Sequence, residues 1–167
     1  TNPQLFFAGG NNGVYRSTNG GNTWTLVLPN SSFGVNEILL LPGNENLVFV
    51  ASDKGLHRSA DGGTTWSQVW NEATYDIKPN VLNAQELYVV KHDAGLNLCT
   101  FLKSIDWGAN WTLQANGWYQ SNDPARNDGG ARIAVTQANP NRIYVYLIGE
   151  SKANDHGFIS IYRSDNA

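Results

Sequence analysis

Apolar residues in this chain come in short runs, several of which follow a turn that contains Asn, Pro or Gly. Four of these runs are rich in β-branched and aromatic residues and end at residues 7, 50, 90 and 146. Such residues favour β-strands, and the residues ahead of them favour turns. Because each run is too short for a typical helix and sits between turn signals, the pattern predicts an all-β chain.

A second pattern keeps the same spacing and follows each apolar run. Residues 16–24, 58–66 and 103–111 align without gaps and read Arg/Lys-Ser-x-Asp/Asn-x-Gly-x-x-Trp, and a fourth copy begins at residues 163–167. We name this motif the box. Trp24 and Trp66 are 42 residues apart, and Trp66 and Trp111 are 45 apart. A period of this size is typical of one four-stranded blade of a β-propeller.

The two registers together predict a partial β-propeller of four-stranded antiparallel blades, with about three to four blades in this chain. With strands lettered A to D outward from the axis, residues 1–30 would supply strands B to D of a first blade. Residues 31–72 and 73–116 would form complete blades, and residues 117–167 would supply strands A to C. A closed ring usually needs about four to eight blades, so we expect this chain to be completed by the rest of a propeller or by a partner chain.

The box has the chemistry of a tight turn between strands C and D. A serine hydroxyl can pin the strand end, Asp or Asn can accept backbone N–H bonds, Gly tolerates positive φ, and Trp can wedge between neighbouring sheets. We therefore assign a structural role, and neither a catalytic nor a metal-binding one, to Ser17, Asn19, Gly21, Trp24, Ser59, Asp61, Gly63, Trp66, Ser104, Asp106, Gly108 and Trp111.

Composition narrows the classes of partner. The net charge is −3 and the 11 Lys and Arg residues form no run, which argues against a nucleic-acid surface. No apolar stretch is long enough for membrane insertion.

The single cysteine, Cys99, cannot form an intrachain disulfide and is expected to be buried. No metal or other cofactor is predicted. The chain contains no Met and no signal peptide, which indicates a processed or internal segment whose targeting information has been removed or lies outside it.

The second box, Ser-Ala-Asp-Gly-Gly-Thr-Thr-Trp at 59–66, and the run Ile-Ala-Val-Thr-Gln-Ala-Asn-Pro-Asn-Arg-Ile-Tyr-Val-Tyr at 133–146 resemble the BNR or Asp-box repeats of the sialidase-like β-propeller superfamily. The chain is most similar in type to sortilin-type and xyloglucanase-type repeats, and to secreted repeat proteins of Bacteroidetes. The resemblance implies an extracellular or cell-surface propeller. It implies no single activity, because the box occurs in hydrolases and in non-catalytic binding proteins alike.

The catalytic motifs of these families do not transfer to the chain. Sialidases of the superfamily carry an Arg-Ile-Pro motif, whereas the nearest string here, Arg132-Ile133-Ala134, lacks the proline. The two aspartates of xyloglucanase-type enzymes match no motif in the chain. The resemblance therefore favours a non-catalytic binding or scaffold module, with a glycoside hydrolase whose site is only partly present as one alternative and a subunit of a surface or secretion assembly as another.

Candidate ligand-binding residues come from three loops, 91–97, 116–130 and 149–157, that are longer than a blade requires. In a propeller the D-to-A and B-to-C loops share one face, and the resemblance implies that this face binds the ligand, a glycan or a peptide. Aromatic faces beside charged groups suit such ligands. The candidates are Trp118, Tyr119, Asp123, Arg126, Asp128, His92 and Asp93. The alternative is that Trp118 and Tyr119 fill the blade junction and that the charged residues are solvated.

Overall fold

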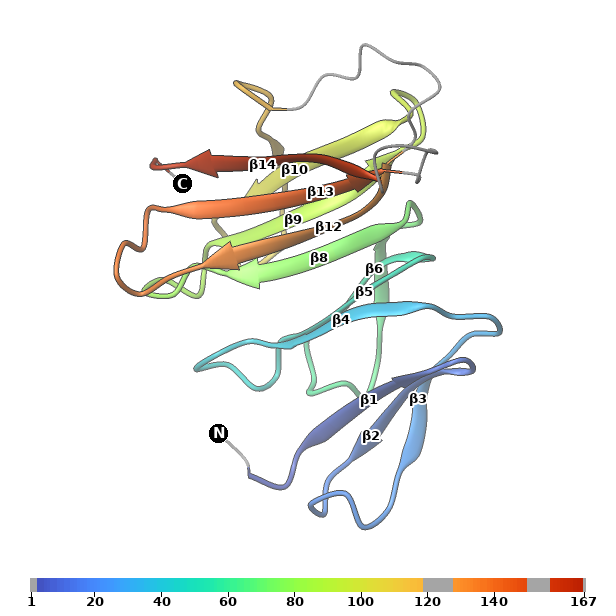
Figure 1. Cartoon of the computed structure of the whole chain (residues 1–167). Helices are drawn as coiled ribbons and strands as arrows, with labels where there is room; N and C mark the ends of the chain where they lie inside the picture. Colours follow the sequence, from blue (N-terminus) through green and yellow to red (C-terminus); the bar gives the residue numbers. More distant parts are fainter. Residues whose placement is uncertain (1–2, 119–127, 150–156, 167) are drawn as a thin grey trace. The chain divides into compact units, whose positions relative to one another are not determined.

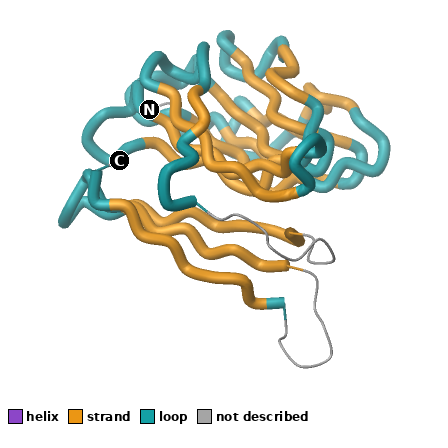
Figure 2. Tube along the Cα trace, turned by 90° about the horizontal axis from the view of Figure 1, so that it is seen from above, coloured by secondary structure: helices purple, strands orange, loops and turns teal. Residues whose placement is uncertain are grey.

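A computed structural model describes residues 3–118, 128–149 and 157–166. The described chain consists of strands and loops, with no helix in these ranges (Figures 1 and 2). It divides into two compact units, unit 1 (Thr1–Thr74) and unit 2 (Tyr75–Ala167), which are described separately below.

Unit 1 holds two antiparallel sheets whose strands follow chain order. Sheet 1 comprises β1 (Phe6–Gly10), β2 (Gly13–Ser17) and β3 (Thr25–Pro29). Sheet 2 comprises β4 (Val35–Leu40), β5 (Val48–Ser52), β6 (Gly55–Ser59) and β7 (Ser67–Trp70). Every residue of β5, which lies between β4 and β6, is buried. Between the sheets, Val14, Phe33 and Val50 form a small core.

Unit 2 also holds two antiparallel sheets whose strands follow chain order. Sheet 3 comprises β8 (Thr74–Pro79), β9 (Leu87–Asp93), β10 (Leu98–Ser104) and β11 (Thr112–Leu113). Sheet 4 comprises β12 (Asp128–Val135), β13 (Ile143–Gly149) and β14 (Phe158–Ser164). The strict alternation of buried and exposed residues along β13 shows that one face of sheet 4 packs inward and the other is exposed.

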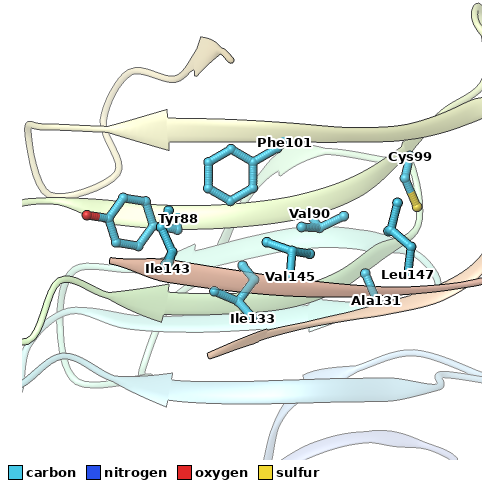
Figure 3. Packing of buried hydrophobic residues seen from close by; sticks show 9 residues of the cluster. All are labelled: Tyr88, Val90, Cys99, Phe101, Ala131, Ile133, Ile143, Val145 and Leu147. Atoms are coloured by element: carbon cyan, nitrogen blue, oxygen red, sulfur yellow. The ribbon is translucent and has the colours of Figure 1, made fainter. Parts of the chain in front are cut away.

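The core of unit 2 lies between sheets 3 and 4. Side chains from both sheets interdigitate along its whole length (Figure 3). Cys99, Ala131 and Leu147 lie at one end of this core, and Tyr88 and Ile143 lie at the other. Cys99 is buried, with its thiol in the apolar core.

Some strands end at other residues than the sequence predicts, and a hydrogen bond between a side chain and the backbone accounts for one of these differences. The last strand of the predicted blade 73–116 is short, β11, because the amide of Asn110 donates to the carboxylate of Asp106 and so belongs to the box turn. Conversely, β9 continues to Asp93, which pairs with Leu98, so the predicted loop 91–97 shrinks to residues 94–97. In the described part of the chain, no helix has the length and apolarity needed to cross a membrane.

Candidate functional site

Unit 2 has two chemically different ends, and the box turns form one of them. In the third box, Ser104 Oγ donates to Asp106 Oδ1 over 2.8 Å and accepts the amide of Gly108 over 2.9 Å. The first and second boxes, in unit 1, make the same two bonds through Ser17 and Ser59. The shared residue types therefore produce a shared hydrogen-bonded turn.

The box carboxylates are fully engaged by the turn. Asp61 accepts the Thr65 hydroxyl at 2.6 Å and the amides of Thr65 and Thr64 at 2.8 and 3.0 Å. These bonds hold the pKa of Asp61 well below its usual range. Hydrogen bonds from the Asn110 side chain and amide lower the pKa of Asp106 to about 2. Such strong acids carry their charge at any physiological pH and are poor proton donors.

The lowered pKa values of Asp61 and Asp106 predict how the box turns respond to acid. A carboxyl whose pKa falls on folding stabilises the folded state above its unfolded pKa, near 3.8, and loses that contribution as pH falls toward the folded value of about 2 for Asp106. In amide NMR spectra, the Asn110 signal should therefore titrate near pH 2 and that of Thr65 at lower pH still. The Thr23 amide is the internal control, because it donates to Asn19, which has no proton to gain. Titration of all three amides near pH 3.8 would contradict the assignment.

The tryptophan of the second box packs against the preceding sheet of unit 1. The indole of Trp66 meets the ring of Phe7 of sheet 1 edge-on, with centroids 6.4 Å apart. Gly63 makes this approach possible, because a Cβ there would lie 2.4 Å from the Phe7 ring, and its φ of +80° suits glycine. Trp24, in the first box, has no preceding sheet in this chain and is 44% exposed.

The opposite end of unit 2 carries the hairpins between strands B and C, and we name it the loop end. Its described residues are His92, Asp93, residues 94–97, Trp118, Gly149 and Gly157. Asp93 Oδ1 accepts the amides of Gly95 and Leu96 at 3.0 and 3.1 Å, which fixes the β9–β10 hairpin. The Lys91 ammonium lies 3.9 Å from Asp93 Oδ2. Asp93 therefore stabilises the turn to which it belongs.

Trp118 is held inside the unit, at the beginning of the long loop. Its indole N–H donates to the carbonyl oxygen of Cys99 over 2.8 Å. Its ring lies between those of Phe101 and Tyr162, with centroid separations of 5.5 and 5.0 Å. Since Cys99 pairs with His92 across the hairpin, the structure brings two of the predicted residues, His92 and Trp118, to one strand position. Trp118 acts there as an anchor for the segment that follows it.

The remaining predicted residues lie at or beyond the edge of the described chain. Tyr119, Asp123 and Arg126 fall outside the described residues, as does the side chain of Asp128. The backbone of Asp128 pairs with Gly149, and the amide of Gly149 donates to the carbonyl of Gly157. The described residues Asp93, Asp128, Gly149 and Gly157 thus lie at the same end of sheets 3 and 4 (Figure 3).

A buried carboxylate that the sequence reasoning missed joins the inner strands of unit 2. Asp76, in β8, is completely buried and accepts the amide of Ile133 in β12 over 2.7 Å. It also accepts the amide of Ile77 and lies 3.0 Å from the Lys78 ammonium. The sequence repeat contains a signal for this residue. Asp76 stands as far ahead of Leu87 as Asn36 stands ahead of Leu47, so a polar side chain recurs at the same position of two repeats. Among the described residues, no group of three His, Cys, Asp or Glu side chains could hold a metal ion.

Comparison with known proteins shows the fold. No family model and no curated protein matches the chain. Among solved structures, an ancestral GH74 enzyme matches 98% of the chain at 22% identity with a TM-score of 0.72. A GH74 enzyme from Niastella koreensis matches 95% at 19% identity with a TM-score of 0.62. The four antiparallel sheets and these neighbours confirm the predicted all-β partial propeller.

The chain is much shorter than the proteins it resembles. It spans 21% of the ancestral GH74 chain and 26% of the Niastella koreensis chain. At this level of identity the similarity concerns the fold, and the activity of the larger proteins does not transfer with it.

Proposed function

We propose that the chain is part of an extracellular, non-catalytic β-propeller that binds a glycan or a peptide at the loop end of unit 2. One observation carries the proposal: the ends of loops 94–97, 119–127 and 150–156 are gathered at one end of a rigid two-sheet core. Rigid scaffolds that bring several loops together are where proteins place binding groups.

The fixed ends of these loops support binding at this end. Asp93 tightens one hairpin, Trp118 fixes the start of the longest loop, and Asp128 re-enters the sheet opposite Gly149. Loops held at both ends lose less conformational entropy when they meet a ligand, which favours affinity. We assign Tyr119, Asp123 and Arg126 to ligand contact within this loop, and Trp118 to holding it in place.

Glycoside hydrolysis is a second candidate function. The similarity in fold to GH74 enzymes favours it, as do Asp123 and Asp128 in the long loop. Acid–base cleavage of a glycosidic bond needs two carboxyl groups roughly 5–10 Å apart. The second carboxylate would then come from another part of a larger ring.

The same proposal includes a family and a location. We assign the chain to the Asp-box repeats of the sialidase-like superfamily, of the sortilin or xyloglucanase type, because all three complete boxes share the Ser–Asp/Asn–Gly hydrogen bonds. Secretion to the cell surface or medium follows from that assignment. A role as a subunit of a surface assembly remains a third candidate, since a partial ring has surfaces that a partner chain can cover.

Two exposed apolar residues at opposite ends of the β9–β10 pair test where the ligand binds. Leu96, at the loop end, is 59% exposed, and Ile105, in the third box, is 69% exposed. On glycan and peptide arrays, Leu96→Glu should weaken binding at least tenfold by placing a charge beside the ligand, whereas the matched variant Ile105→Glu should bind like the parent chain. Neither change should alter the free energy of unfolding by more than about 0.5 kcal/mol, because both sites are solvated. Equal binding by the two variants would contradict the location.

Reducing-sugar release distinguishes binding from hydrolysis. The proposal expects no release from any polysaccharide that the arrays identify as a ligand. Release that is lost in Asp123→Asn or Asp128→Asn, with binding retained, would replace it with the hydrolase assignment.

A further inference from the structure

Three asparagines in the chain stand directly before a glycine, the sequence context in which an asparagine side chain most readily loses ammonia. They are Asn12, Asn19 and Asn116. Because glycine has no Cβ, its amide nitrogen is open to approach by the side chain of the preceding residue. The reaction needs no enzyme, so the surroundings decide where it occurs. The carboxamide and the glycine amide must both be free to move, and water must reach them.

The first of these sites, Asn12–Gly13, is held by sheet 1. Gly13 is buried in β2, where it pairs with Gly10 of β1 and with Pro29 of β3. The backbone of the next strand lies directly against it, because a Cβ at Gly13 would overlap the carbonyl oxygen of Leu28. The Gly13 amide therefore cannot turn toward the Asn12 side chain unless β2 leaves the sheet.

The second site, Asn19–Gly20, is held by the hydrogen bonds of the first box. The carboxamide oxygen of Asn19 accepts the Ser17 hydroxyl and the Thr23 amide, each over 2.9 Å, and its nitrogen donates to the Thr23 hydroxyl over 2.8 Å. The Gly20 amide, which would have to attack the side chain, donates to the carbonyl oxygen of Gln4 over 3.0 Å. Each polar group that the reaction needs is thus bonded to another partner.

The third site, Asn116–Gly117, has a similar glycine and none of these bonds. Gly20 and Gly117 both have a φ of 70°, and a Cβ at either would meet no atom within 4 Å. Asn116 and Gly117 are both exposed. Within the described residues, neither the Asn116 carboxamide nor the Gly117 amide has a hydrogen-bond partner. The bond across this turn, from the Trp118 amide to the Ala115 carbonyl oxygen, is 3.3 Å long.

The third site also has room for the reaction and for its product. Residues 113–117 form a polar wall of a cavity of about 410 Å³ between sheets 3 and 4. Asn116 therefore lies between this cavity and solvent, where its side chain can rotate onto the Gly117 nitrogen. The charged side chains that line the cavity, Lys103 and Arg163, are both basic. A carboxylate formed at position 116 would thus meet no acidic side chain of that lining.

We propose that Asn116 is a site of spontaneous deamidation and that isoaspartate formed there releases Trp118. The Gly117 nitrogen loses its proton to solvent and bonds to Cγ of Asn116. The bond from Cγ to Nδ2 then breaks, and Nδ2 takes up a proton and leaves as ammonia. Water opens the resulting succinimide ring at either of its carbonyl carbons. Opening at Cγ gives aspartate, whereas opening at the main-chain carbonyl gives isoaspartate, whose main chain runs through the former side chain.

Isoaspartate changes the chain directly ahead of Trp118. It adds one carbon to the main chain and leaves a carboxylate in the turn. Trp118 is held by its indole bond to Cys99 and by packing between Phe101 and Tyr162. These contacts require a fixed length of chain between β11 and the indole, so the added carbon should weaken them. Aspartate keeps the length of the main chain and should leave Trp118 in place.

The first test follows all three asparagines in the folded chain by peptide mapping and mass spectrometry during incubation in mildly alkaline buffer. We expect Asn116 to convert roughly tenfold faster than Asn12 and Asn19, because those sites must first break hydrogen bonds or leave a sheet. In guanidinium chloride the three rates should agree to within about threefold, since only the local sequence then acts. Equal rates in the folded chain, or a rate difference that persists after unfolding, would show that the proposal is wrong.

The second test measures the consequence for Trp118 by hydrogen exchange of its indole N–H. This proton should exchange roughly tenfold faster in the isoaspartate form than in fresh protein, because its bond to the Cys99 carbonyl opens more often. Two fresh variants serve as controls. Asn116→Gln keeps a carboxamide but would need a larger ring to react, and Asn116→Asp carries the charge without the added carbon. Both should exchange like the parent chain. Full protection in the isoaspartate form, or loss of protection in fresh Asn116→Asp, would overturn the release of Trp118 by a lengthened main chain.

Discussion

Replacement of Trp66 by alanine is expected to destabilise unit 1 by about 2–4 kcal/mol, because it removes a half-buried indole from the junction of two sheets. The indole packs edge-on against Phe7 and closes the cluster of Val14, Phe33 and Val50. Its loss would expose that cluster to water and leave a void that the rigid strands cannot fill. Residue-resolved hydrogen exchange at β2 and β5 would measure the loss within unit 1.

Trp24→Ala is the matched control, since it changes the same residue type at the same box position. Trp24 is 44% exposed, so the cost should stay below about 1 kcal/mol. A large effect at both positions would mean that the tryptophan stabilises its own turn. A large effect at Trp66 alone means that it joins neighbouring sheets.

The sequence predicted those features of the chain that depend on local chemistry. A box turn is specified by residues at most eight apart. Its hydrogen bonds link positions two to four apart: Ser59 bonds with Asp61 and Gly63, and Asp61 bonds with Thr65. Strands β5, β9 and β13 follow from apolar runs that need no knowledge of their partners. The period of these two signals was sufficient to predict the all-β partial propeller, which the structure and its neighbours confirm.

Contacts between residues far apart in the chain were beyond prediction from a single sequence. Trp118 stood out as an aromatic residue in a polar loop, but its hydrogen bond reaches Cys99, 19 residues earlier. Whether such an indole faces solvent or the core depends on how sheets 3 and 4 pack, which no local pattern encodes. The pairing of Asp76 with Ile133 spans 57 residues and was missed for the same reason.

Asp76 also gives a large expected effect from a single substitution, because its carboxylate is fully buried between the inner strands of unit 2. Asp76→Ala would leave the amides of Ile133 and Ile77 without their acceptor and the Lys78 ammonium without its counterion. Removing one partner of a buried charge pair costs about 3–5 kcal/mol. We expect the lower part of that range, since the Lys78 side chain is 26% exposed and can be partly hydrated.

Asp53→Ala is the control for a carboxylate with the same kinds of partner in an exposed place. Asp53 accepts the amide of Gly34 over 2.9 Å and lies 3.8 Å from the Lys54 ammonium, but its side chain is 46% exposed. Water can replace both contacts, so its removal should cost no more than about 1 kcal/mol. Exchange of the Ile133 amide separates the two cases, because Asp76→Ala should accelerate it by a factor of a hundred or more, whereas Asp53→Ala should leave it unchanged. Should Ile133 remain protected without the Asp76 carboxylate, the inner strands of unit 2 would be held by apolar packing alone, and the buried charge would have no part in joining sheet 3 to sheet 4.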